Sequence, residues 1–593
     1  MTSSRPLLLA LIPALALAAP AWAQEPQVPP VIVPAPTGGV PLGEIEPAPP
    51  PSIPEIWAPV PVDEQGRSAY GLFLAGRMAA GQGDAAAGAD YLRRAQTLAP
   101  EQPTLRDQAF ATNLLGGDLG FAGRIAPEGG EVPAAISEVG RLVEIVQAFG
   151  AGDARGALAA LEARPIERPH QRAGRLVTPF IAATAGDWDR ALRPVTGTGT
   201  DIATLYGRSH RARLLEMRRR HDEAAQEWAL ATRPRLGRRL FGLDHGAFLE
   251  RRGRRAEAIA LYDSLLAEGV VDGRIDAARA RAAARRRPPA LPSLRQGASD
   301  AMTAAAVQAT AEGQHEFAAV YLRLAYDLVP SDATLLNLGD ALTQAQLTTP
   351  GRQALMRIGP ADPGLYASAQ LAMAESLVAE GMDEAALDPL LRAAEVFPDS
   401  PEVIVALAGR LIAVERFDDA LKVLEGMPEA VGASRFDLTV LRGRALNRLG
   451  RTAEAEAQFQ AALLLRPDDP ATLSALGYLW VDGVRVEEGA ALIARAAAAL
   501  PDDRDVRNAL GWSQYRLGRF EEAVATLEGA VELAPADAVA NAHLGDAYWR
   551  VGRRREAHFQ WYRAITLDPD AELKSQLERR LEVGLADAEP SGS

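Results

Sequence analysis

Cysteine is absent from the 593 residues of this sequence. Disulfide bonds, thiolate sites for zinc or iron–sulfur clusters and cysteine nucleophiles are thereby excluded. A lipid-modified N-terminal cysteine is excluded as well, so the chain is not expected to be a bacterial lipoprotein. Lysine is also scarce, because Lys422 and Lys574 are the only two among 63 basic residues. The 77 acidic residues give a net charge of -14, which argues against a nucleic-acid partner, since phosphate-binding surfaces are normally basic.

Motifs of catalysis are missing too. The seven histidines are scattered with no pair at metal-ligand spacing, and the chain contains no HExxH, GxxxxGK[ST] or GxSxG motif. Gly197-Thr198-Gly199 lacks the third glycine of a dinucleotide-binding loop. Acidic pairs such as Glu487-Glu488 and Glu521-Glu522 are expected to be solvated charges at helix starts. We therefore expect no enzyme, with no catalytic residue, no cofactor and no metal.

The N-terminal residues predict export. Arg5 precedes an apolar run from Pro6 to Ala19, and Ala21-Trp22-Ala23 supplies the small residues of a cleavage site. Residues 1–23 are therefore expected to be a signal peptide, which predicts a periplasmic protein. An uncleaved anchor is the alternative, but about 16 apolar residues are few for a membrane span, which needs about 20. No transmembrane span is expected after cleavage.

A proline-rich segment follows. Thirteen of the 36 residues from Pro26 to Pro61 are proline, which removes backbone N–H donors and fixes φ. Residues 24–66 are expected to be a disordered linker. The linker is either a simple spacer or a docking site for a partner that recognises proline.

The strongest pattern is a repeat of 34 residues, marked by Pro467, Pro501, Pro535 and Pro569. With these prolines at position 32, small residues recur at positions 8, 20 and 27 and large residues at position 24. The residues at positions 8 and 20 are Gly443, Gly477, Gly511 and Gly545, and Ala455, Gly489, Ala523 and Ala557. Those at positions 27 and 24 are Ala462, Ala496, Ala530 and Ala564, and Phe459, Ile493, Leu527 and Trp561.

This pattern resembles the tetratricopeptide repeat (TPR), in which each repeat is a hairpin of two antiparallel helices. Small facing residues let the two helices approach closely, and the large residue is expected to fill the gap to the next repeat. The proline ends the second helix. We expect an all-α protein, a TPR-type α-α superhelix (solenoid) of about 14 helical hairpins with a C-terminal capping helix.

The repeat frame continues upstream with drift and sets the domain boundaries. Residues 67–284 are expected to form degenerate TPR-like repeats, and residues 299–569 regular TPR repeats. Between them, residues 285–298 are rich in proline and arginine, so they are expected to break the helices and divide two subdomains. Residues 570–593 are expected to form the capping helix, with Leu573, Leu577 and Leu581 on one face, and a disordered tail.

A binding groove is expected along the first helix of each hairpin, at repeat positions 2, 5, 9, 12 and 13. Aromatic, amide and charged side chains at these positions could hold a peptide. The candidate residues are Tyr478, Asp482, Asn508, Trp512, Tyr515, Arg516, Asp546, Trp549 and Arg550. The alternative is that Trp512 and Trp549 pack between adjacent helices as ordinary repeat core.

Positive charge is concentrated between Arg208 and Arg287. This region holds 20 arginines and 11 acidic residues, a net charge of +9, so the remainder of the chain carries -23. An anionic partner could be drawn to residues 208–287. The alternative is that these arginines only solvate helix surfaces.

Three phrases in the last repeats carry a more specific resemblance. They are Ala475-Leu476-Gly477-Tyr478, Asn508-Ala509-Leu510-Gly511-Trp512 and His543-Leu544-Gly545-Asp546-Ala547-Tyr548-Trp549. From about Ala298 to Leu585 the sequence resembles a family of long exported TPR proteins of Gram-negative bacteria. A lipoprotein relative in that family is an adaptor that binds a carboxyl-terminal processing protease and presents peptidoglycan hydrolases to it. This chain departs from that relative in having no cysteine for a lipid anchor.

The resemblance implies a non-enzymatic periplasmic scaffold or adaptor for protein–protein interactions. Its implied partners are a carboxyl-terminal processing protease and peptidoglycan hydrolases of the cell wall. The alternative is a structural TPR component of an envelope assembly that exports polysaccharide or serves the outer membrane.

Overall fold

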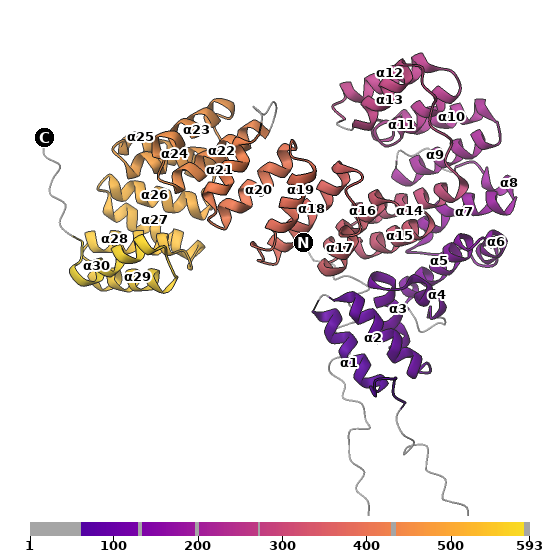
Figure 1. The fold of residues 1–593 in the computed structure, drawn as a ribbon, viewed down its shortest axis with the longest axis horizontal. Helices are drawn as coiled ribbons and strands as arrows, with labels where there is room; N and C mark the ends of the chain where they lie inside the picture. The colour runs from indigo at the N-terminus through magenta and orange to yellow at the C-terminus, as the bar shows by residue number, and fades with distance from the viewer. Residues whose placement is uncertain are drawn as a thin grey trace, which may run out of the picture. The chain divides into compact units, whose positions relative to one another are not determined.

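The computed structural model describes residues 61–82, 84–127, 133–195, 201–270, 273–427 and 434–585. These residues form 30 α-helices and, apart from one isolated bridge between Val62 and Ser68, no β-structure (Figure 1). The predicted signal peptide and most of the predicted linker lie outside the described residues, as does the predicted tail after residue 585. The chain divides into two compact units, with unit 1 ending at Gly359 and unit 2 beginning at Pro360.

The first seven helices of unit 1 are α1 (Ala69–Gly81), α2 (Ala85–Leu98), α3 (Pro103–Gly116), α4 (Leu119–Arg124), α5 (Ala134–Gly150), α6 (Ala154–Ala163) and α7 (Gln171–Ala185). The next six are α8 (Trp188–Ala191), α9 (Ile202–Met217), α10 (His221–Thr232), α11 (Arg235–Arg251), α12 (Arg255–Ala267) and α13 (Gly273–Ala283). Unit 1 ends with α14 (Leu294–Ala311), α15 (His315–Leu328), α16 (Asp332–Gln344) and α17 (Thr348–Leu355).

Unit 2 begins with α18 (Pro363–Ala379), α19 (Leu387–Val396), α20 (Pro401–Ala413), α21 (Phe417–Glu425), α22 (Ser434–Arg448), α23 (Thr452–Leu465) and α24 (Pro470–Asp482). It continues with α25 (Val486–Ala499), α26 (Arg504–Arg516), α27 (Phe520–Leu533), α28 (Ala538–Arg550), α29 (Arg554–Thr566) and α30 (Ala571–Val583).

These helices pair into hairpins, as the sequence predicted. Six pairs run from α1/α2 to α11/α12 and eight from α14/α15 to α28/α29, which makes 14 hairpins among the described residues. The capping helix is confirmed as α30, which packs against α29 and buries Leu577 completely.

The boundaries of the helices in unit 2 have a local cause. The prolines at position 32 end the second helices, and two residues later Asp469, Asp503 and Asp537 cap the next first helix. Each carboxylate accepts a hydrogen bond from a backbone N–H of the first helical turn, for example from Ala540 to Asp537 at 3.0 Å. A Pro-x-Asp sequence therefore both stops one helix and starts the next.

Small residues hold the two helices of a hairpin together. A Cβ atom on Gly477 would lie 2.7 Å from the carbonyl oxygen of Gly489, and one on Gly489 would lie 2.5 Å from that of Gly477. No side chain larger than hydrogen fits at this crossing without moving the backbone. Positions 8 and 20 face each other, as predicted.

The large residue at position 24 lies over the glycine at position 8 of its own hairpin. A Cβ on Gly545 would lie 2.4 Å from Trp561 Cδ1, and one on Gly443 would lie 2.6 Å from Phe459 Cε1. Phe459 also shares an apolar cluster with Leu476 of the next first helix. The side chain expected to fill the gap between repeats therefore also packs inside its own repeat.

Unit 1 departs from a linear array. Helix α14 packs against α7 and α9, and α15 packs against α5, although at least the four helices α10–α13 lie between the partners in sequence. The break predicted for residues 285–298 is shorter in the structure: the stretch between Ala283 and Leu294 has no helix, but residues 294–298 already belong to α14, which Ser293 caps. The break lies inside unit 1, because the contacts of α14 with α7 and α9 join its two sides; the compact units divide further on, after Gly359.

We predict that Gly545→Ala destabilises unit 2 by about 2 kcal/mol or more, because the new methyl group would overlap Trp561. Gly409→Ala is a matched control, since it also lies within a first helix but its Cβ would meet nothing within 4 Å. The control is expected to be neutral or to stabilise by up to about 1 kcal/mol. Urea unfolding of the two variants measures this difference, and equal stabilities would contradict the packing argument.

Candidate peptide groove

The first helices of unit 2 form a concave face. Helix α24 contacts α26, and α26 contacts α28. Tyr478 of α24 also reaches α28, with 3.4 Å between its hydroxyl oxygen and Nε2 of His543. A contact that skips one hairpin requires the first helices to curve toward each other.

A groove of about 400 Å³ lies on this face, between α22, α24, α26 and α28. Its lining includes Arg444 and Asn447 of α22, Tyr478 of α24, Asn508 of α26 and Val539 of α28. The groove therefore combines a cation, two amides, an aromatic ring and the carboxylates of Asp503 and Asp505 with apolar side chains. This mixture suits an extended protein segment, whose backbone and side chains need both kinds of contact.

Several groove side chains are available for a ligand. The side chains of Arg444 and Asn447 are exposed, and within the described part of the chain neither has a hydrogen-bond or ion-pair partner. Leu500, just before α26, and Val539 line the same groove, and each is 39% exposed. Covering this apolar surface would favour binding.

A stack of aromatic rings lies beside the groove. The Trp512 ring stacks on His543, with centroids 4.1 Å apart and an interplanar angle of 14°, and on Tyr515, with centroids 4.9 Å apart and an angle of 9°. Nδ1 of His543 lies 3.0 Å from Oδ1 of Asn508. These contacts lock Asn508 and Tyr478 in place, so part of the groove is pre-organised before any ligand arrives.

His543 is a neutral imidazole. Burial lowers its pKa to about 3, and the nearby Arg580 guanidinium lowers it further by repulsion. In the tautomer that fits the contacts, Nδ1–H donates to Asn508 and the Tyr478 hydroxyl donates to Nε2. Burial likewise raises the pKa of Tyr478 above its usual value, so its hydroxyl stays protonated.

The other predicted groove residues form contacts within the protein. Arg516 donates to the backbone carbonyl of Asp482 at 3.1 Å and lies 3.4 Å from its carboxylate. Arg550 donates to the hydroxyl of Tyr515 at 3.3 Å.

Asp546 and Trp549 lie where α30 covers the last hairpin. Asp546 is 2% exposed; it accepts a hydrogen bond from Trp561 Nε1 at 2.8 Å and lies 3.2 Å from Arg580 of α30. Burial raises the pKa of Asp546 to about 6, although Arg580 opposes the shift. Trp549 packs on Trp561, with ring centroids 5.3 Å apart, and belongs to the same apolar cluster as Leu577.

The structure thus brings Tyr478, Asn508 and Trp512 together and buries Asp546 against α30. That the nine predicted residues contact a partner stays a prediction. Sequence reasoning missed Arg444, Asn447 and Val539, although they occupy positions 9, 12 and 2, which were expected to line the groove. Of the nine predicted residues, Tyr478 and Asn508 line the groove, whereas Asp546 and Trp549 lie in the last hairpin, which the capping helix covers.

Most of the arginines in the basic region 208–287 lie on α9–α13. At least ten of the 20 form ion pairs with carboxylates. Arg213, for example, is buried between Asp244 at 2.7 Å and Asp300 at 2.5 Å. Much of the positive charge that the sequence shows here is neutralised within the fold.

Within the described ranges, no group of three or more histidine, aspartate or glutamate side chains is arranged to hold a metal ion. Among the same residues, no helix has the length and apolar character that a membrane crossing requires.

The TPR family model matches residues 438–469 and 505–537. No curated protein matches the chain. Solved structures similar to it include the APC/C hetero-tetramer Cut9-Hcn1, with 13% identity, 86% of this chain and 95% of that chain covered, and a TM-score of 0.35. MamA AMB-1 has 24% identity, 28% and 96% coverage and a TM-score of 0.24. A TPR protein from Parabacteroides merdae ATCC 43184 has 14% identity, 48% and 98% coverage and a TM-score of 0.32. The chain carries TPR repeats, and its fold is a TPR-type α-α solenoid.

We predict that Arg580→Met destabilises unit 2 by about 3 kcal/mol, because it leaves the Asp546 carboxylate buried without its cation. Arg579→Met on the same helix is the control and is expected to change stability by less than about 0.5 kcal/mol, since Arg579 is exposed. Thermal unfolding of both variants measures the effect, and equal melting temperatures would show that the ion pair does not fasten α30.

We also predict that acid weakens the fold partly through His543. Its folded pKa of about 3 lies below the unfolded value of about 6.5, so unfolded chains bind the proton first as the pH falls below about 6.5. Stability is then lost by up to about 1.4 kcal/mol per pH unit for this group. Urea unfolding at pH 7, 6 and 5 should show a shallower loss for His543→Gln than for the wild type, and parallel curves would refute the assignment.

Proposed function

We propose that this chain is a non-enzymatic scaffold that binds an extended segment of a partner protein in the groove of unit 2. The observation that carries the proposal is the groove itself, with the unpaired Arg444 and Asn447 beside half-exposed Leu500 and Val539. A protein ligand on this concave face would form hydrogen bonds with the unpaired polar groups and cover the exposed apolar surface.

The stiffness of the face supports the same proposal. Tyr478, Asn508, Trp512 and His543 hold one another across three hairpins. A pre-organised surface loses little conformational entropy when a ligand binds, so more of the contact energy appears as affinity.

We further propose that the scaffold acts in the periplasm and recruits a carboxyl-terminal processing protease and peptidoglycan hydrolases. Support for this location and these clients comes from the signal-like residues 1–23 and from the resemblance of the last repeats. The alternative, a structural part of an envelope export assembly, would use the same groove for a different partner.

The test is to tag the protein in its own cells, crosslink gently and identify the co-purified proteins by mass spectrometry. A processing protease or wall hydrolase at near-stoichiometric yield supports the adaptor role. Export or polymer-synthesis components would refute these clients and support the alternative.

We predict that Leu500→Ala combined with Val539→Ala weakens binding of the recovered partner about tenfold, or about 1.5 kcal/mol, because both side chains line the groove. Leu464→Ala combined with Val484→Ala removes the same residue types, and these side chains are 85% and 94% exposed and are not part of the groove lining. The control pair is expected to bind like the wild type. Equal affinities for the two double variants would show that the partner does not bind in the groove, and the fold assignment would still hold.

A further inference from the structure

Unit 1 contains a second groove at the place where it departs from a linear array. Helix α14 packs against α7 and α9, and two adjoining cavities of about 380 and 460 Å³ lie along α7. The first is lined mainly by α7 and α9 and the second mainly by α7 and α14. They share Arg172, Arg175, Leu176 and Ala203, so they form one continuous groove, which we call the α7 groove.

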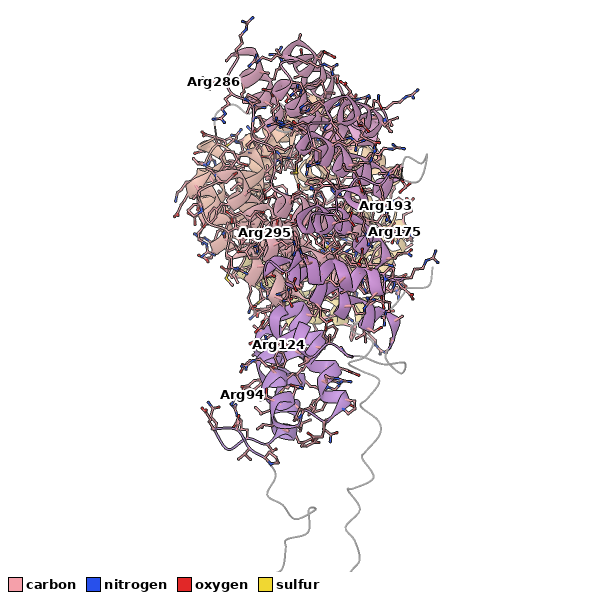
Figure 2. All side chains as sticks on the ribbon, turned by 90° about the vertical axis from the view of Figure 1, so that its right-hand side faces the viewer. Arg94, Arg124, Arg175, Arg193, Arg286 and Arg295 are labelled. Carbon is pink, nitrogen blue, oxygen red and sulfur yellow. The ribbon has the colours of Figure 1, made fainter. Side chains whose placement is uncertain are left out.

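Arginine dominates the charge of the α7 groove. Arg168, Arg172, Arg175, Arg193 and Arg211 all line it. Figure 2 shows Arg175 and Arg193, which line the same cavity, on one side of unit 1. Arg172 and Arg175 are three residues apart on α7, so their side chains share one helix face.

Three of these arginines have no partner among the residues that the structure describes. Arg172 pairs with Glu312, and Arg211 pairs with Glu227 and donates to the Leu192 carbonyl at 3.0 Å. Arg168, Arg175 and Arg193 are exposed, and within the described ranges their side chains have no hydrogen-bond or ion-pair partner.

The carboxylates that line the α7 groove are already engaged. Glu312 pairs with Arg172, and Asp201 caps α9 by accepting hydrogen bonds from the N–H of Thr204 at 3.0 Å and from its hydroxyl at 2.7 Å. The hydrogen bonds from Thr204 hold the pKa of Asp201 below its usual value, so it stays ionised. Five arginines face two carboxylates, and three of the positive charges are uncompensated.

The remainder of the lining is mainly apolar in the first cavity, and the second cavity adds Gln171, Gln308 and Gln314 to its apolar residues. Leu176, Ala203 and Pro179 lie between the arginines, and α14 adds Ala304 and Ala305. His210 is 2% exposed and lines the first cavity, and its Nδ1 has no hydrogen-bond partner among the described residues. Burial and the adjacent Arg213 lower its pKa to about 3, so the imidazole adds no charge of its own.

We propose that the α7 groove binds an acidic segment of a partner protein, with its carboxylates paired to Arg168, Arg175 and Arg193 and its apolar side chains on Leu176 and Ala203. Arginine pairs carboxylates with two parallel N–H donors, and apolar contacts between such pairs strengthen them by excluding water. This site is separate from the groove of unit 2 and does not depend on the function proposed for it.

The shape of the α7 groove favours a chain of residues over a small anion. Its uncompensated arginines line two cavities that continue into each other, with small apolar residues between them. A phosphate ion would occupy one arginine cluster and leave the apolar surface exposed. A segment that alternates acidic and small apolar side chains would fill both cavities.

The test uses the full chain and a fluorescein-labelled 12-residue peptide of alternating glutamate and alanine, with binding followed by fluorescence anisotropy. The matched peptide has glutamine in place of glutamate. We predict that the glutamate peptide binds at least tenfold more tightly than the glutamine peptide. The combined substitutions Arg175→Glu and Arg193→Glu should lower its affinity at least tenfold, because both line the first cavity.

The control is Arg285→Glu with Arg286→Glu, which makes the same charge change on exposed arginines of unit 1 that are not part of the α7 groove lining. It should alter the affinity less than twofold, and far-UV circular dichroism should show all variants equally helical. Equal weakening by both double variants would mean non-specific attraction to net charge and would overturn the proposal. Complete displacement of the peptide by millimolar inorganic phosphate would reassign the groove to a small anion, and preferential binding of heparin would reassign it to a polyanionic glycan.

Discussion

The close approach of the two helices in each hairpin is the contact on which the rest of the architecture depends. Where Gly477 faces Gly489, the backbones touch, and the large residue at position 24 lies directly on the opposite glycine. This crossing fixes the angle within a hairpin, and successive hairpins repeat that angle along unit 2. A repeated small rotation produces a face on which the first helices converge. The groove is therefore a consequence of packing at positions 8, 20 and 24, several residues away from it.

At the end of the array, the first helix of the last hairpin does not present an open groove. Helix α30 packs where the first helix of another hairpin would lie and covers the last exposed apolar surface. In doing so it brings Arg580 onto Asp546 and leaves Trp549 against Trp561. The same repeat positions therefore line the groove at Arg444 and Tyr478 and belong to the core at Asp546. Position within the repeat determines the direction of a side chain, and the neighbouring hairpin determines whether solvent reaches it.

These two effects explain how much the sequence could predict. The 34-residue spacing of Pro467, Pro501 and Pro535 was sufficient for the hairpins of the last repeats, and the leucine spacing in residues 570–585 was sufficient for the terminal helix, because each depends on residues close in sequence. Hairpin α11/α12 was harder to recognise, since Val270 stands where proline would be expected. Its glycine and large residue, Gly246 and Tyr262, keep the spacing of 16 residues found at Gly545 and Trp561, and a Cβ on Gly246 would lie 2.3 Å from the Tyr262 ring. The packing of α14 on α7 had no such signal, because it joins segments more than 100 residues apart that share no periodic pattern.

Charged binding surfaces are likewise hard to predict from the sequence alone. Between Arg208 and Arg287 the sequence has a net charge of +9, yet the fold pairs many of these arginines with carboxylates, some of them distant in sequence, such as Asp300 with Arg213. The arginines of the α7 groove are fewer, and the sequence around Arg168 to Arg193 gave no sign of a binding surface. They are uncompensated because the two carboxylates near α14 are already engaged: Glu312, just after the helix, pairs with Arg172, and Asp300 within it pairs with Arg213. The attraction of a surface for an anion depends on the charges that remain unpaired there. A count of charged residues along the sequence therefore overestimates this attraction for residues 208–287 and overlooks it for the α7 groove.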